Sequence, residues 1–202
     1  MTNAIRSELI GSLLGATEEQ AVETFFAFMC DRGQSNYDES VTQIAHALQC
    51  AELADTGDCG DQIVTAALFH DIGHLLLDEH DSQSGFLHED LNHEEAGAAL
   101  LKDYFPEDVT EPIRLHVPAK RYLCTTDTSY YERLSAASKR SFQVQGGNLS
   151  ADEQAQLESN PGLVVALRLR QFDDLGKQSG HNAPSIHTYT DSVKRCLRPD
   201  RP

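Results

Sequence analysis

The stretch DQIVTAALFHDIGHLLL, residues 61–77, decides the fold. Its apolar side chains recur at intervals of three and four residues, which is the spacing of a helix rather than a strand. We expect one buried helix here, capped by Asp61, with the adjacent pair His70 and Asp71 inside it. A buried carboxylate is costly unless it is paired or bound to a metal, so the pair predicts a polar site in the core. Gly73 costs about 1 kcal/mol relative to alanine in a helix and predicts close packing there.

Helical spacing continues on both sides of this stretch, and alternating strand patterns are scarce. The further expected helices are 18–30, 40–57, 93–105 with Asn92 as its cap, a short helix 111–116 ended before Pro118, 129–145 closed by glycines, 150–160 with a Ser150–Glu153 capping box, 162–176 after Pro161, and 185–197. The predicted fold class is all-α. No linker or repeat divides the chain, so we expect one domain over residues 1–202, with N-terminal helices 1–35 and a C-terminal tail 180–202 as extensions.

Charge and composition exclude several function classes. Acidic residues outnumber basic ones 32 to 16, giving a net charge of −16. Such a surface repels nucleic-acid phosphates and anionic lipid, so neither is an expected partner. No apolar run is long enough to cross a bilayer and no signal core begins the chain, so we expect a cytoplasmic protein. The 5 cysteines are odd in number and lack C-x-x-C spacing, which indicates neither a disulfide framework nor a thiolate zinc site.

Further histidines and a second carboxylate accompany the central pair. A buried histidine alone is more often a satisfied core residue than a ligand, but several together favour a metal. One set of two histidines and two carboxylates can hold one ion, and two extra histidines allow a second. Imidazole and carboxylate donors suit iron, manganese or zinc. The candidate ligands are His46, His70, Asp71, His93, His116 and Asp173.

The order of these residues resembles the HD-domain superfamily, a helical metal-binding fold of mostly phosphohydrolases. The segments QIAHALQCA, ALFHDIGH, NHEEAGAALL, HVPAKRYL, LSAASKR with QGG, and LRLRQFDDLGK further resemble the motifs of the mixed-valent diiron oxygenases that cleave the carbon–phosphorus bond of 1-hydroxyphosphonates. The resemblance covers approximately residues 36–178. It implies an HD-domain helical bundle, and HVPAKRYL is far more specific evidence than the histidine–aspartate pair.

The resemblance implies two iron ions, Fe(II) and Fe(III), with O2 as co-substrate. His46, His70, Asp71 and Asp173 would bind one iron, and His93 and His116 would complete the second. Asp71 would bridge the two ions. A carboxylate has two oxygens and can span two cations, whereas an imidazole offers one lone pair.

The same resemblance assigns a further group of residues to a small phosphonate substrate. These are His74, Lys120, Ser138, Gln145 and Arg170. A doubly charged anion suits a point charge at Lys120, a planar fork at Arg170 and neutral donors beside them. Viewed singly, Lys120 and Arg170 fit ordinary surface charges, but Arg170 lies three residues before Asp173 on the same helix face, which favours a role in the site. Ser138 is equally compatible with a small packing residue, and Gln145 with a position before the glycine turn.

Tyr37 and Glu39 are implied to form a catalytic gate, in which the tyrosine occupies an iron site until substrate displaces it. Glu39 falls on the family position, whereas Tyr37 stands one position from it. The segments YDESVTQ and FHDIGHLLLDEHD resemble the branch of the family that acts on a trimethylammonium substrate. We therefore expect cleavage of 1-hydroxy-2-(trimethylammonio)ethylphosphonate to glycine betaine and phosphate. The alternatives are the 2-amino analogue giving glycine, a metal-dependent phosphohydrolase using activated water, and a non-catalytic metal-binding module.

Overall fold

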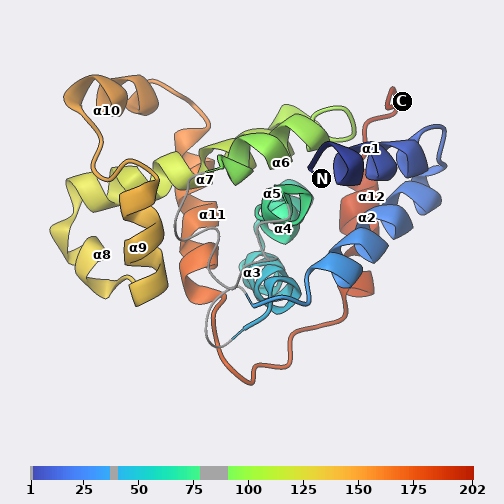
Figure 1. The fold of residues 1–202 in the computed structure, drawn as a ribbon, viewed down its shortest axis with the longest axis horizontal. Helices are drawn as coiled ribbons and strands as arrows, with labels where there is room; N and C mark the ends of the chain where they lie inside the picture. Colours follow the sequence, from blue (N-terminus) through green and yellow to red (C-terminus); the bar gives the residue numbers. More distant parts are fainter. Residues whose placement is uncertain (1, 37–40, 78–90) are drawn as a thin grey trace.

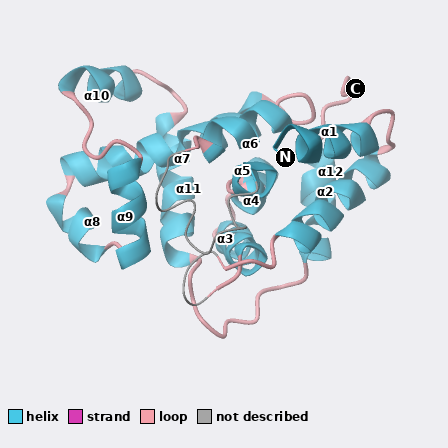
Figure 2. Ribbon diagram, in the orientation of Figure 1, coloured by secondary structure: helices cyan, strands magenta, loops and turns pink. Residues whose placement is uncertain are grey.

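A computed structural model describes residues 2–36, 41–77 and 91–202. Its described secondary structure is helical apart from one isolated bridge between Asn36 and Thr42 (Figure 2). The helices, labelled in Figure 1, are α1 Thr2–Leu13, α2 Glu18–Arg32, α3 Gln43–Thr56, α4 Asp61–Phe69, α5 Ile72–Leu77, α6 His93–Leu101, α7 Glu107–Thr126, α8 Thr128–Arg133, α9 Ala136–Val144, α10 Ala151–Glu158, α11 Leu163–Leu175, the 3-10 helix η2 Ile186–Tyr189, and α12 Thr190–Cys196. The predicted all-α fold is confirmed. Among these residues no helix is both long and apolar enough to cross a membrane.

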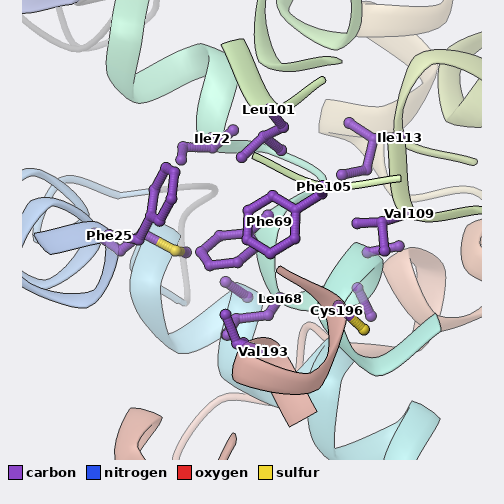
Figure 3. Packing of buried hydrophobic residues seen from close by; sticks show 14 of the residues in the cluster. Phe25, Leu68, Phe69, Ile72, Leu101, Phe105, Val109, Ile113, Val193 and Cys196 are labelled. Atoms are coloured by element: carbon purple, nitrogen blue, oxygen red, sulfur yellow. The ribbon is translucent and has the colours of Figure 1, made fainter. Parts of the chain in front are cut away.

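Helix α4 lies at the centre and packs against α3, α7, α11 and α12 (Figure 1). Phe69, its last residue, sits in a cluster of aromatic rings (Figure 3). The ring centroid of Phe69 lies 5.5 Å from that of Phe25 in α2 and 5.7 Å from that of Phe105, which follows α6. Aromatic pairs contribute about 0.5–1.5 kcal/mol each beyond their burial. The cluster therefore anchors the backbone immediately before His70.

The predicted single helix over residues 61–77 is wrong at its centre. The α-helix is interrupted at His70 and Asp71, which form a turn although His70 keeps helical backbone angles, so α4 and α5 are separate helices. The His70 ring contributes to this break, because its Nδ1 lies 2.9 Å from the carbonyl oxygen of Ala67 and donates to it. The predicted cap is also wrong. Gly60, with φ of 81°, caps α4 and Asp61 lies in the first turn, where a carboxylate favours the helix dipole.

The predicted short helix ending before Pro118 is wrong as well. Helix α7 is continuous and contains both Pro112 and Pro118. A proline inside a helix costs about 3 kcal/mol. Leu115 and Val117 are buried on one side of Pro118, and burying such a side chain contributes about 1.5–3 kcal/mol. Tertiary packing therefore outweighs the local preference of the chain.

Helix ends marked by strong local signals lie where the sequence predicts them. Helix α3 ends before Gly57, and both hydrogen bonds of the Ser150–Glu153 capping box are present. The predicted helix over 129–145 is divided, because Leu134 is extended and Ser135 caps α9. Helices α8, α9 and α10 lie to one side of α7 and α11 (Figure 1). They pack on small apolar clusters separate from the main core.

Gly73 lies where α5 meets α6, in the close packing that its position predicts. A Cβ atom at Gly73 would stand 1.8 Å from the carbonyl oxygen of His93. Gly73→Ala is therefore expected to push the two helices apart and to lower the free energy of unfolding by about 1–3 kcal/mol. Thermal unfolding followed by circular dichroism measures this. The control is Gly11→Ala, where nothing lies within 4 Å of the new methyl group; equal melting temperatures for both variants would contradict the packing argument.

Candidate metal centre

Six side chains from five parts of the fold meet in the core. They come from α3, the turn between α4 and α5, α6, α7 and α11, which are packed against one another. Each is at most 7% exposed: His46, His70, Asp71, His93, His116 and Asp173. The structure thus brings together every residue that the sequence suggests as a metal ligand.

Asp71 stands between two pairs of imidazoles. Its Oδ2 atom lies 3.2 Å from Nε2 of His70 and 3.6 Å from Nε2 of His46. Its Oδ1 atom lies 3.4 Å from Nε2 of His93 and 3.5 Å from Nε2 of His116. Each carboxylate oxygen therefore faces a different histidine pair. This is the arrangement that a bridging ligand requires, because each oxygen can serve its own cation.

The main chain sets the tautomer of three of these histidines. A carbonyl oxygen can only accept, so a ring Nδ1 bonded to it carries the proton and leaves the lone pair on Nε2. The bonds run from His46 to Gly176 at 2.9 Å, from His70 to Ala67 at 2.9 Å, and from His116 to Ile113 at 2.7 Å. Nδ1 of His93 lies 3.5 Å from the buried Glu94 carboxylate. In His46, His70 and His116 the Nε2 atom therefore faces the centre of the site with a lone pair that can bind a metal.

Within each pair the Nε2 atoms approach closely. The distance is 3.2 Å between His46 and His70, and 3.1 Å between His93 and His116. Two nitrogen lone pairs at this separation repel each other unless a proton or a metal cation is bound to them. Oδ2 of Asp71 is also buried without a hydrogen-bond partner among the described residues. These donors fit two metal ions, and nitrogen and oxygen ligands suit iron, manganese or zinc.

Both carboxylates are held in the ionised form that metal binding requires. Burial alone would raise the pKa of Asp71, but in the metal-free centre a proton carried on Nε2 of His70 and of His93, where a metal would otherwise bind, holds that pKa well below its ordinary value. Burial acts in the same direction on Asp173, yet the charges of Arg170 and Lys177 keep its pKa well below the usual range. Asp173 further faces the first histidine pair, with Oδ1 3.4 Å from Nε2 of His46.

Cys50 lies beside this pair, and its thiol is hydrogen-bonded to the main chain. Its Sγ is 3.7 Å from Nε2 of His46, and its thiol donates to the carbonyl oxygen of Phe172 at 3.4 Å. Burial raises the pKa of Cys50 well above its ordinary value. A thiolate is the form that binds metals, so in the metal-free centre Cys50 is protonated, while its Sγ lies close enough to His46 and His70 for the three to share an ion.

His74 adjoins the second histidine pair. Its ring stacks on that of His93, with centroids 3.7 Å apart and planes 16° from parallel. Its Nε2 atom lies 4.0 Å from Oδ1 of Asp71. The predicted substrate residue thus borders the candidate metal centre.

A second polar cluster lies next to Asp173, and we call Lys120, Lys177, Ser138 and Ser141 the lysine–serine cluster. Lys120 is 4% exposed, and its Nζ donates to Oγ of Ser141 at 2.9 Å. Nζ of Lys177 donates to Oγ of Ser138 at 3.3 Å and lies 3.4 Å from Oδ1 of Asp173. Two ammonium groups and two hydroxyls therefore gather beside the metal centre, as an anionic ligand would require.

The sequence analysis missed Lys177 and Ser141. The available signal was spacing: Lys177 follows Asp173 by four residues, and Ser141 follows Ser138 by three. Lys120 and Arg170 are buried rather than surface charges.

The phosphonate-binding roles of Arg170 and Gln145 stay predictions. The Arg170 guanidinium is paired with Asp173 and Asp174. Oε1 of Gln145 is buried and has no hydrogen-bond partner in the part of the chain that the structure describes. Tyr37 and Glu39 lie outside the described residues, so the gate stays a prediction.

Comparison with known proteins agrees with the resemblance seen in the motifs. Residues 41–140 match the HD domain family. Hydroxymethylphosphonate dioxygenase of Gimesia maris is 50% identical over 184 residues, 91% of this chain and 92% of that protein. The glycine-betaine-forming [1-hydroxy-2-(trimethylamino)ethyl]phosphonate dioxygenase of Leisingera caerulea is 41% identical over 171 residues, 82% of this chain and 85% of that protein. The chain therefore belongs to the HD-domain family of phosphonate dioxygenases.

Proposed function

We propose that the protein is a diiron oxygenase that cleaves the carbon–phosphorus bond of hydroxymethylphosphonate. The observation that carries this is the placement of Asp71 between two histidine pairs, beside the lysine–serine cluster. One O2 and one substrate dianion, HOCH2PO3²⁻, give formate and H2PO4⁻. This balances atoms and charge with both oxygen atoms of O2 incorporated, and no outside reductant is needed.

The choice of hydroxymethylphosphonate rests on the comparison. The relative named for this substrate is 50% identical, against 41% for the relative named for the trimethylamino substrate. The second candidate remains the trimethylammonio compound, which the motif YDESVTQ favours. A quaternary ammonium requires aromatic faces and negative charge, and the sequence offers Tyr37 and Glu39 for this. Hydroxymethylphosphonate lacks an ammonium group, so its site needs neither aromatic faces nor negative charge for one.

Each polar group of the site has a part in the proposed reaction. Iron held by the six ligands as an Fe(II)/Fe(III) pair would activate O2. Asp71 keeps the two histidine pairs at a fixed separation, and Asp173 completes the first set of donors. The ammonium groups of Lys120 and Lys177 bind phosphonate oxygens, with the serine hydroxyls and His74 as further partners. Burial of these groups excludes water, which strengthens each charged contact.

The affinity for phosphonate should depend on pH through Lys120. Burial and the charge of Arg170 lower the pKa of Lys120 to about 7. Anion binding requires the ammonium form, so KM should rise above pH 7, by up to about tenfold per pH unit. Lys120→Arg stays charged across this range and should lack that rise. KM measured against pH for both proteins tests the assignment, and parallel profiles would show that another group titrates.

Oxygen consumption tests the proposed reaction directly. The protein is reconstituted anaerobically with Fe(II), exposed to limited O2 and given hydroxymethylphosphonate, the trimethylammonio compound or the 2-amino analogue. We expect phosphate release in a one-to-one ratio with O2 uptake, fastest with hydroxymethylphosphonate. Hydrolysis of phosphate esters without O2 would instead support a phosphohydrolase. Two bound irons without turnover of any phosphonate would support a non-catalytic module.

A further inference from the structure

Tyr130 connects α8 to the end of α11, although it is 44 residues from its partner in sequence. Its hydroxyl donates to Oδ2 of Asp174 at 2.6 Å. Burial raises the pKa of Tyr130 above its ordinary value, so the hydroxyl keeps its proton and remains a donor. Neither Tyr130 nor Asp174 belongs to the candidate metal ligands or to the lysine–serine cluster.

Asp174 also accepts hydrogen bonds from Arg170. Nε of Arg170 donates to Oδ1 of Asp174 at 3.1 Å, and Nη2 contacts the same oxygen. The remaining terminal nitrogen, Nη1, contacts Oδ2 of Asp173. Arg170 is 2% exposed and Asp173 1%. Arg170 is therefore bound by the carboxylates of both Asp173 and Asp174. Because its guanidinium is planar and rigid, a shift of the Asp174 carboxylate also shifts the group that holds Asp173.

Asp173 in turn directs its other oxygen to the metal centre. Oδ1 lies 3.4 Å from Nε2 of His46 and 3.4 Å from Nζ of Lys177. With Oδ2 held by Arg170, rotation of the carboxylate is restricted. A fixed carboxylate loses less conformational freedom when it binds a metal, which is why groups behind metal ligands affect affinity.

We propose that Tyr130 is a positioning residue, which acts through Asp174 and Arg170 to orient Asp173 for the metal bound beside His46 and His70. This inference rests on the proposed function only in taking Asp173 as a metal ligand. It assigns Arg170 mainly to support of that ligand, whereas the sequence suggests a phosphonate-binding fork.

The neighbouring Tyr131 provides a matched contrast. Its ring packs on Phe142 with centroids 5.4 Å apart, and Nζ of Lys139 lies 5.5 Å from its ring centroid. Both tyrosines pack against the same small apolar cluster, formed by Cys124, Leu134 and Phe142. Tyr130 differs in reaching α11 through its hydroxyl. Removing the hydroxyl from each residue therefore separates orientation of the ligand from packing of the cluster.

The test is metal titration of the metal-free protein and of Tyr130→Phe, Tyr131→Phe and Asp174→Asn. Mn(II) is the probe, added without O2 and followed by EPR of the free ion. We expect Tyr130→Phe to weaken one of two binding steps about tenfold, as groups behind metal ligands do, and to leave the other step unchanged. Tyr131→Phe should bind as the parent protein does. Adding Tyr130→Phe to Asp174→Asn should cause little further loss, because both act through one connection.

Three results would overturn the proposal: unchanged affinities in Tyr130→Phe, equal weakening of both steps, or equal losses in Tyr130→Phe and Tyr131→Phe. Melting temperatures of the metal-free variants reveal any general loss of folding. The titration needs no turnover, so absence of oxygenase activity would reject the proposed function and leave this inference intact. In an active enzyme, KM at saturating iron should change less than twofold in Tyr130→Phe.

Discussion

Asp71→Asn is expected to reduce metal binding from two ions to at most one per chain and to abolish phosphonate turnover. Asparagine keeps the shape of the side chain but offers one acceptor oxygen, and its amide N–H groups would face the other imidazole pair. In the structure one oxygen faces His70 at 3.2 Å and the other faces His93 at 3.4 Å. The loss of activity should exceed the roughly 10- to 100-fold effect of changing residues behind the ligands.

Metal content after anaerobic reconstitution with Fe(II), together with O2 uptake on hydroxymethylphosphonate, measures this effect. Asp200→Asn is the matched control, because Asp200 is an exposed carboxylate paired with Arg198. The control should bind iron and turn over substrate as the parent does. Two tightly bound irons in Asp71→Asn would be incompatible with a bridging role for Asp71.

Lys120→Met is expected to retain both metals and to raise KM for the phosphonate strongly. A hydrogen bond to a charged group contributes about 1.5–3 kcal/mol, which corresponds to a rise in KM of roughly 10- to 100-fold. The long, flexible methionine side chain occupies much of the same buried space. Nζ of Lys120 bonds to Ser141 rather than to a candidate metal ligand. Metal binding should therefore be unaffected.

Steady-state kinetics at saturating O2, with iron measured in the same samples, separates the two roles. The comparison with Asp71→Asn is the decisive one, since Asp71→Asn should lose metal and Lys120→Met should lose substrate affinity. Equal iron loss in both would show that Lys120 supports the metal centre and would reject its assignment to the phosphonate.

The sequence predicted those parts of the fold that depend on local chemistry. Gly57 ends α3, and Ser150 and Glu153 begin α10 with a capping box. The break at His70 was not predictable in this way. Apolar spacing continues across residues 61–77, and the interruption depends on a ring-to-carbonyl bond and on partners from distant helices. The expected helix end at Pro118 was wrong for the opposite reason, because burial of neighbouring residues such as Leu115 and Val117 outweighs a strong local signal.

Some residues of the candidate site could also be identified from the sequence, and others needed the structure. The six candidate ligands are of residue types that stand out in an apolar setting, so they were identified from the sequence. Lys177 and Ser141 did not stand out, because lysine and serine are common on exposed helix faces. Lys177 lies near Asp173 through a spacing of four residues, whereas the contacts of Ser141 with Lys120 and of Ser138 with Lys177 arise only when α9 packs beside α7 and the end of α11. The pairing of Arg170 with Asp173 and Asp174 follows spacings of three and four residues within α11, but its burial needed the structure.

The carbonyl bonds to three imidazoles have a consequence for how this centre tolerates sequence drift. Every residue has a main-chain carbonyl, so no substitution at positions 67 or 113 deletes the acceptor that His70 or His116 uses. The tautomers of these rings are thus insulated from point mutation, provided that the helices keep their course. Position 176 is the exception, since a Cβ there would stand 2.5 Å from Sγ of Cys50. Substitution at positions 67 and 113 is therefore limited by their burial in the core and not by the bond to the histidine, whereas at position 176 the close contact with Cys50 adds a further limit.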